Sequence, residues 1–507
     1  MTVSNICILG TIAVYLVGML IIGFRCARKN ESSADFYLGG RKLGPLVTAM
    51  SAEASDMSSY LLMGLPGLAY LSGVADVGWT AIGLAVGTYL NWLFTALRLR
   101  RYTQETGSFS RRFRDDKNIL AVLAAVIIII FFIPYTASGF AACGKLFSSL
   151  FGMNYMTAMI ISAVVIVAYT TAGGFFAASA TDFVQSIIMT VAIVFVLVFS
   201  TISAGGIDAV VENAKALPGY LSLTASYIED TGKSEPYNLL HIITTLSWGL
   251  GYFGMPHILL RFMAIEDEKK LKLSRRVASV WVVIAMAMAV LIGIVGRALS
   301  NTGLVDQLHG NDTETIIVRV AHLLSTYGAF PAIMAGLILA GILASTMSTA
   351  DSQLLAAASS VSENILREAF HLKISEKKSM LAARLTVIGI AILGIIIARN
   401  PDSSVFGIVS FAWAGFGAAF GPLVICSLFW KRTTLPGAIV GMVSGGAMVF
   451  IWKYLIKPIG GVFGIYELLP AFLVGLVLMV IVSLCTKAPS KEITDEFDRV
   501  KAMGKAK

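Results

Sequence analysis

Long apolar stretches separated by short polar breaks run from one end of the chain to the other. A helix needs about 20 apolar residues to cross a bilayer. The pattern therefore predicts an all-α polytopic membrane protein. We expect thirteen spans, near residues 4–24, 46–71, 75–97, 118–149, 155–173, 180–204, 238–258, 277–298, 328–360, 380–398, 404–429, 435–454 and 466–486.

Composition supports this fold class. Of the 507 residues, 57% are hydrophobic and 14% are charged, whereas soluble domains carry about 25% charged residues. Little of the chain is left for a separate soluble domain. We expect one transmembrane domain over residues 1–486 and a cytoplasmic tail over 487–507.

The distribution of lysine and arginine predicts the orientation. With the N-terminus outside, 31 of the 39 lysines and arginines lie on the cytoplasmic side, counting Arg384 at the membrane edge, as the positive-inside rule requires. The net charge of +9 thus reflects orientation and gives no sign of a nucleic-acid partner. The outer segments 205–238 and 300–326 are then expected to be surface loops with short helices. The cytoplasmic segments are 25–45, 98–117, 259–276, 361–379, 430–434, a turn at 173–179 and the tail.

Two spans have the composition of interrupted helices. The second holds two acids and four serines in residues 50–60, followed by Gly64, Pro66 and Gly67, and the seventh holds three glycines and a proline in residues 247–256. Either segment alone has a packing explanation, because glycine and proline are common in membrane helices. As a pair in corresponding positions of two halves, they indicate the binding site of a secondary transporter.

The two interrupted spans are five spans apart and run in opposite directions. Spans 2–6, about 46–204, and spans 7–11, about 238–429, are therefore predicted to form two repeats of inverted topology. The remaining helices are expected to be peripheral: 4–24, 435–454 and 466–486. Such a core works by alternating access, an arrangement that a channel does not need.

The ninth span carries hydroxyl groups on one helical face. They lie at i, i+3, i+4 and i+7: Ser345, Ser348, Thr349 and Ser352. Such hydroxyls can also bond to their own helix four residues back. Near Asp56 an unwound second span would add the carbonyls of Ala54 and Met57 and the hydroxyls of Ser55 and Ser58. Together these oxygens favour a site for a hard monovalent cation.

Four acids have separate interpretations. Asp56 lies at mid-membrane, where a carboxylate costs about 2.5–3.5 kcal/mol, so we expect it to organise either the cation site or the unwound backbone. Glu53, about one turn earlier, either has a functional role or makes only a structural hydrogen bond. Asp351 is interpreted as a supporting or pairing acid. Asp182 opens the sixth span at the cytoplasmic edge, where it either caps the helix or assists ion exit.

Three mid-span aromatic residues are candidates for solute contact. Trp248 and Tyr252 are four residues apart in the second break, and Tyr135 follows Pro134 in the fourth span. Aromatic walls suit a small ring together with an ammonium group, although anchoring and packing explain most membrane tryptophans and tyrosines.

Enzymatic and nucleotide-driven functions have no support in the chain. The run from Gly139 to Lys145 imitates a phosphate-binding loop, but Leu146 follows it and no strand precedes it. The five histidines lack metal-ligand spacing. We expect a non-enzymatic protein with no organic cofactor.

Several long motifs resemble a known family. They are the runs at residues 39–45, 51–67, 248–257 with 261–264, and 347–355. They are similar to the solute:sodium symporter family, and within it to bacterial sodium/proline symporters, over residues 5–486. The resemblance implies thirteen helices with a leucine-transporter-like 5+5 core in a bacterial cytoplasmic membrane, and the symport of L-proline with sodium.

The resemblance also implies roles for particular residues. Sodium would be held by backbone oxygens and hydroxyls of Ala54, Met57, Ser345, Ser348 and Thr349. Asp56, Ser58, Asp182 and Arg41 would support coupling, gating or ion release. Proline would contact Tyr135, Trp248, Tyr252 and Pro256.

The chain departs from the pattern of the enteric bacterial members at several positions. Glu53 and Ser59 replace glycines, Tyr60 replaces a tryptophan, Ser345 replaces an alanine, and Ala350-Asp351 replaces an apolar residue and a serine. None of these changes removes an implied sodium ligand. Two alternatives stay open: a same-family symporter of another amino acid, pantothenate or a sugar, and a solute sensor built on a transporter fold.

Overall fold

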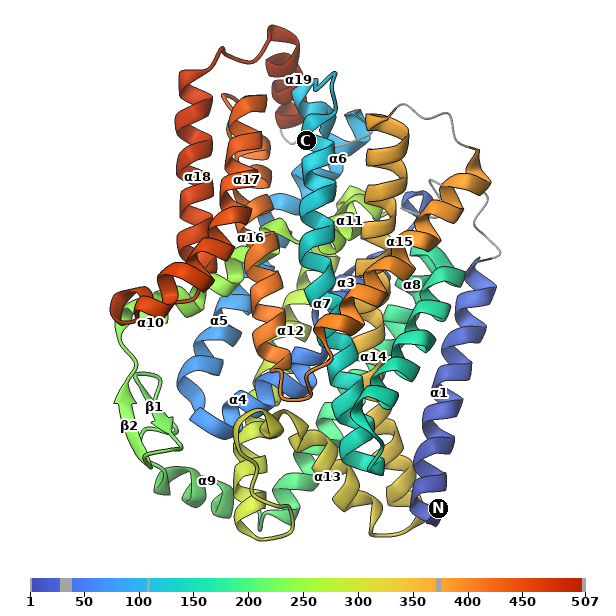
Figure 1. Cartoon of the computed structure of the whole chain (residues 1–507), viewed down its shortest axis with the longest axis vertical. Helices are drawn as coiled ribbons and strands as arrows, with labels where there is room; N and C mark the ends of the chain where they lie inside the picture. The colour runs from blue at the N-terminus through green and yellow to red at the C-terminus, as the bar shows by residue number, and fades with distance from the viewer. Residues whose placement is uncertain (1, 28–38, 107–109, 371–374, 504–507) are drawn as a thin grey trace.

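The computed structural model describes residues 2–27, 39–106, 110–370 and 375–503. Helices run along the long axis of an elongated bundle, with the start of the first helix, α1, and the last helix, α19, near opposite ends of that axis (Figure 1). The helices are α1 (Val3–Ala27), α3 (Pro45–Asp56), α4 (Leu65–Ser72), α5 (Val74–Leu90), α6 (Ala96–Thr106), α7 (Ile119–Phe151), α8 (Tyr155–Ser203), α9 (Ile207–Ala216), α10 (Leu239–Leu246), α11 (Pro256–Ala264), α12 (Leu271–Asn301), α13 (Ile316–Ser325), α14 (Ala329–Ser359), α15 (Glu376–Ile397), α16 (Val405–Phe429), α17 (Leu435–Ile451), α18 (Leu468–Cys485) and α19 (Lys491–Ala502).

Every predicted span coincides with helix. Within the described ranges, ten helices are long and apolar enough to cross a membrane, and two shorter apolar helices accompany them. The prediction of an all-α polytopic membrane protein is therefore confirmed. The number of crossings and the orientation stay predictions.

The second span is broken, as its composition predicts. α3 ends at Asp56, and Met57 has φ −73° and ψ 67°. The Ser58 amide donates to the Asp56 carbonyl at 2.7 Å, which makes Met57 the centre of an inverse γ-turn. A π-helical segment from Tyr60 to Gly64 then leads into α4. The break therefore exposes main-chain groups in the middle of the bundle.

The seventh span is broken at its glycines. α10 gives way to a 3-10 segment over Ser247–Gly254, Met255 is extended, and Pro256 starts α11. A β-carbon on Gly249 would lie 2.3 Å from the Gly83 carbonyl oxygen in α5. Glycine is needed here because the two backbones touch.

The fifth and sixth spans meet at a glycine. α8 consists of two helices joined across a kink at Gly174, whose φ is 71° and ψ 179°. The kink falls within the predicted turn at 173–179, but the apolar helix of the sixth span begins at Gly174 and not near residue 180. A glycine can reverse φ at one residue without unwinding its neighbours. As a result Asp182 does not open a helix, but lies eight residues beyond the kink.

The outer segments are more structured than surface loops. Residues 205–238 contain α9 and an antiparallel hairpin of β1 (Ala225–Ile228) and β2 (Lys233–Pro236), in which Ala225 pairs with Pro236. In residues 300–326, α13 buries most of its side chains. The expectation of exposed loops is wrong for α13, because its apolar face packs against α14 and α7.

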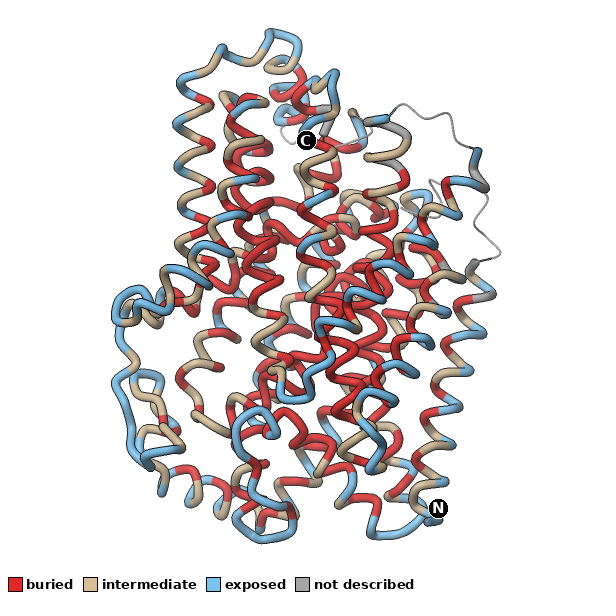
Figure 2. Tube along the Cα trace, viewed as in Figure 1, coloured by how far each residue is buried: buried red, intermediate tan, exposed pale blue. Residues whose placement is uncertain are grey.

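Burial differs strongly from helix to helix, and the most buried segments lie in the middle of the bundle (Figure 2). In α14 and α16, 72% and 83% of the most apolar window is buried, against 28% in α1 and 33% in α18. α15, which is predicted to belong to the second repeat, is also only 28% buried, so the division into core and peripheral helices stays a prediction. α14 and α16 enclose the site together with α3, α7 and the 3-10 segment of the seventh span.

Segments predicted to be cytoplasmic meet at one end of the bundle. In α19, Glu492 and Glu496 each lie 3.0 Å from Arg114, and Asp498 pairs with Lys431. Phe497 is buried under the Arg112 guanidinium. The tail is thus a docked helix, which agrees with placing these segments on one side of the membrane.

Candidate functional site

Four of the five predicted cation ligands converge between α3 and α14. The Ser348 hydroxyl donates to the Ala54 carbonyl at 2.8 Å and lies 3.2 Å from the Ser345 carbonyl. The Thr349 hydroxyl donates to the same Ser345 carbonyl at 3.0 Å. These residues are at most 3% exposed. Because Ala54 is at the end of α3, the cluster joins the break to the hydroxyl face of the ninth span.

Met57, the fifth predicted ligand, is at the centre of the break. Its amide donates to the Glu53 carbonyl at 2.7 Å, and its sulfur accepts from the Tyr60 hydroxyl at 3.4 Å. Ser58, Tyr135 and Thr349 line a hole of about 10 Å³ next to it. That volume is about what one small guest such as a water molecule needs.

Asp56 is turned toward the seventh span. Its Oδ2 accepts from the Tyr252 hydroxyl at 2.5 Å, and its carbonyl accepts from the Tyr135 hydroxyl at 3.4 Å. Asp56 is completely buried and its Oδ1 has no partner. Asp56 therefore links the two broken spans and the fourth span, three elements that the sequence analysis assigns to the site.

The aromatic candidates form a packed wall. The Trp248 ring stacks on Tyr466 with centroids 5.0 Å apart, and the Tyr252 ring lies edge-on to Trp413 at 5.1 Å. The Trp413 indole N–H donates to the Trp248 carbonyl at 2.8 Å. Trp413 and Tyr466 fix both rings, yet no sequence motif marks either residue. Only the aromatic richness of α16 could have drawn attention to Trp413.

A second polar cluster surrounds Arg261. Its guanidinium lies 3.0 Å from Asp182 Oδ2 and donates to the Ser352 hydroxyl at 2.5 Å and to the Ser51 hydroxyl at 3.1 Å. Asp351 Oδ1 accepts from Ser352 at 3.2 Å. Asp182 is completely buried. The predicted position of Asp182 at a membrane-edge helix start is wrong, and its partner Arg261 was given no role by the sequence reasoning.

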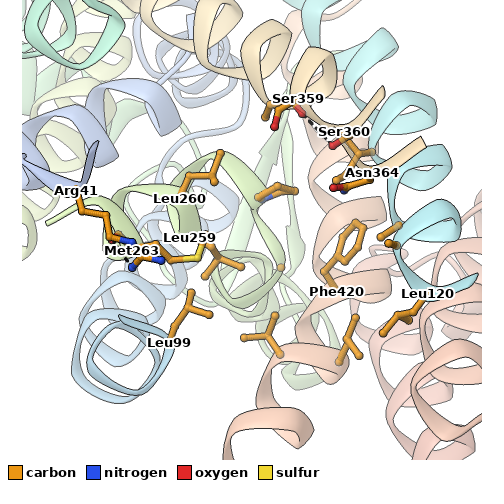
Figure 3. A pocket seen from close by; sticks show the side chains of 18 residues that line it. Arg41, Leu99, Leu120, Leu259, Leu260, Met263, Ser359, Ser360, Asn364 and Phe420 are labelled. Atoms are coloured by element: carbon orange, nitrogen blue, oxygen red, sulfur yellow. Dashed lines mark hydrogen bonds between the residues drawn. The ribbon is translucent and has the colours of Figure 1, made fainter. Parts of the chain in front are cut away.

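A cavity of about 300 Å³ is lined by Arg41 and reaches the seventh-span break at Gly254 and Pro256. Arg41 donates to the Thr103 carbonyl at 2.9 Å and the Met263 carbonyl at 3.1 Å. Burial and the nearby Arg100 charge lower the pKa of Arg41. Asn364 lines the wall opposite Arg41 (Figure 3). The cavity connects the break with the end of the bundle that we predict to be cytoplasmic.

A buried ion pair closes the opposite end. Lys145 lies 2.7 Å from Glu314, which also accepts from the Ser404 hydroxyl at 2.9 Å and from the amides of Val405 and Phe406 at 3.0 Å. Glu314 thus caps the N-terminus of α16 and ties the segment before α13 to α7. The pair has no signal in the sequence, because its two partners are 169 residues apart.

No group of three or more histidine, cysteine, aspartate or glutamate side chains within the described ranges is arranged to hold a metal ion. The oxygens around Ala54 are carbonyls and hydroxyls, which are ligands for a hard cation.

The sequence was compared with models of protein families and with known proteins, and both comparisons match sodium-coupled or proline transporters. The model of the Sodium:solute symporter family matches residues 36–445. The sodium/proline symporter of Escherichia coli (strain K12) is 40% identical over 499 residues, which cover 96% of this chain and 95% of that protein. The high-affinity proline transporter PutP of Bacillus subtilis (strain 168) is 40% identical over 488 residues, covering 95% and 98%.

Solved structures share the fold. A Na+-coupled sialic acid symporter in a substrate-bound outward-open state superimposes with a TM-score of 0.75 at 18% identity, covering 97% of this chain and 99% of that one. The nucleobase-cation-symport transporter Mhp1 gives 0.55 at 15% identity, covering 92% and 99%. The fold is that of the leucine-transporter class, and with the family model matching most of its length, the chain belongs to the sodium:solute symporter family.

Proposed function

We propose that this protein is a secondary active symporter that imports L-proline together with sodium by alternating access. The main support is the hydrogen bond from Tyr252 to Asp56, which joins the two broken spans. It lies beside the oxygen cluster of Ala54, Ser345 and Ser348. Relatives that are 40% identical over nearly the whole chain are named as proline transporters.

Sodium would bind where the hydroxyls of Ser348 and Thr349 now donate to carbonyls. Rotation of these two hydroxyls would turn their lone pairs toward an ion, and the carbonyls of Ala54, Met57 and Ser345 would complete an oxygen cage. The ion then holds α3 against α14. Sodium binding therefore favours the conformation in which the second span is ordered.

Proline would bind between the breaks. Tyr252 and Trp248 offer ring faces for the pyrrolidine, and Tyr135 brings a hydroxyl from the fourth span. The N-terminus of α11 begins at Pro256, and the amide groups of such a helix end attract a carboxylate. The cavity beyond Pro256 supplies the exit, with Arg41 and Asn364 on its walls. Asp182 pairs with Arg261, and Asp351 is connected to Arg261 through Ser352. From there the two acids would assist ion release.

The decisive experiment is uptake of labelled proline into proteoliposomes under an imposed sodium gradient, with and without a proton gradient. We expect concentrative uptake that depends on sodium and collapses with its gradient. Asp56→Asn and Thr349→Ala are expected to abolish it. Competition by other amino acids, pantothenate and sugars tests the choice of solute. Sodium-independent or absent uptake of proline contradicts the proposal.

A further inference from the structure

Two buried carboxylates lie at the end of α3. Glu53 and Asp56 are three residues apart, so their side chains are neighbours on one helical face. Their residues are 1% and 0% exposed. In the part of the chain that the structure describes, no lysine, arginine or histidine lies within ion-pair distance of either acid. Two buried carboxyl groups in the middle of the bundle therefore have no protein cation beside them.

Each carboxylate has one bound oxygen and one free oxygen. The Trp92 indole N–H donates to Glu53 Oε1 at 3.1 Å, and the Tyr252 hydroxyl donates to Asp56 Oδ2. Glu53 Oε2 and Asp56 Oδ1 are buried with no hydrogen-bond partner. A buried polar atom without a partner is costly, so these two atoms require an explanation.

A third unpartnered oxygen belongs to the neighbouring span. Asn91 is 1% exposed, and its amide nitrogen donates to the Tyr252 carbonyl at 2.9 Å. Its Oδ1 is buried without a partner. Asn91 directly precedes Trp92, the donor to Glu53. The unsatisfied atoms of Glu53, Asp56 and Asn91 are all oxygens, and an electropositive guest satisfies such a set.

The helix itself adds to the demand for positive charge. The C-terminus of a helix carries a partial negative charge that disfavours acids and favours cations. α3 ends at Asp56 inside the bundle. The predicted ligands of the first sodium ion are neutral carbonyls and hydroxyls, so that ion balances one carboxylate at most. One carboxylate is left over.

We propose that Glu53, Asp56 and Asn91 bind a second sodium ion. This inference rests on the proposed sodium symport, which supplies the ion. Carboxylate and amide oxygens are suitable ligands for a hard cation, and two sodium ions balance two acids.

The first test counts sodium ions on purified, monodisperse protein by equilibrium binding of radioactive sodium without proline. We expect two ions for the native protein and one for Glu53→Gln. The double variant Ser348→Ala/Thr349→Ala should keep one, and the triple variant none. Glu212→Gln, which neutralises an exposed acid in α9, is the control and should keep two. A native count of one, or a count of two in Glu53→Gln, overturns the proposal.

The second test measures the sodium-to-proline ratio in proteoliposomes from the reversal potential. We expect two sodium ions per proline in the native protein, and one in Glu53→Gln and in Glu53→Gly, with uptake still sodium-dependent. A native ratio of one, or a second charge carried by protons, overturns the second site. If the native protein shows no sodium-driven proline uptake, the proposed function fails, and the binding count still decides the second site.

Discussion

The hydrogen bond from Tyr252 to Asp56 holds the two broken spans together. Tyr252→Phe removes the hydroxyl and leaves both carboxylate oxygens of Asp56 unpartnered. A hydrogen bond to a charged group is worth about 1.5–3 kcal/mol, so we expect the sodium concentration for half-maximal uptake to rise about 10- to 100-fold. The measurement is the sodium dependence of proline uptake in proteoliposomes.

Tyr155→Phe is the matched control for this prediction. Its hydroxyl donates to the Ala398 carbonyl at 2.7 Å, far from the breaks along the chain, and its loss should leave the sodium dependence unchanged. An equal shift in both variants would show that Tyr252 acts only through general stability.

The Arg261 cluster makes a prediction about stability. Arg261→Gln leaves Asp182 buried and unpaired, and breaking a buried ion pair costs about 3–5 kcal/mol. We expect a large fall in the thermal unfolding temperature in detergent. Adding Asp182→Asn removes the stranded charge, so the double variant should be more stable than Arg261→Gln alone. If the fall in the double variant equalled the sum of the falls in Arg261→Gln and Asp182→Asn, a direct pairing would be contradicted.

Some residues of the site could be predicted from the sequence and others could not. The hydroxyl stripe of α14 and the acid Asp56 could be predicted, because helical spacing and the cost of a membrane carboxylate are local properties. Arg261, Trp413 and Tyr466 could not, because each acts through a neighbour distant in the chain. Asp182 was misplaced because the helix of the sixth span begins at the Gly174 kink, before its predicted start near residue 180.

Helices and their breaks also differ in how well the sequence predicts them. The breaks in the second and seventh spans follow from glycine, proline and serine, whose effects are confined to one or two helical turns. The burial of α13 was missed because its polar flanks resemble a loop, while its apolar face is recognised only once α7 and α14 are in place.

The segment before α13 yields a prediction of its own. Glu314 accepts from Lys145 and from two amides at the start of α16. Glu314→Ala strands the buried Lys145 and uncaps α16, whereas Glu314→Gln keeps an oxygen for the amides. We expect the unfolding temperature to fall in the order native, Gln, Ala. An Ala variant as stable as the native protein would mean that this pair does not fasten the two elements.

Across the whole molecule, the cavity and the buried pair lie toward opposite ends. The cavity leads from the seventh-span break toward Arg41 and Asn364, while Lys145 and Glu314 fasten the other end. The structure therefore resembles a transporter whose site communicates with the cytoplasmic side, provided that the N-terminus is outside. Orientation and conformation can be tested together.

Asn364→Cys, in a protein whose five native cysteines are replaced, places one thiol on the cavity wall. We expect a membrane-impermeant maleimide to label it in inside-out vesicles and not in right-side-out vesicles. Asp230→Cys, an exposed position between β1 and β2, should show the reverse. Sodium with proline should slow labelling of Asn364→Cys, because ligands favour conformations in which the exit is closed. Labelling of both thiols from the same side would contradict the topology. If neither sodium nor proline changed the labelling rate of Asn364→Cys, the cavity would not be part of the transport path.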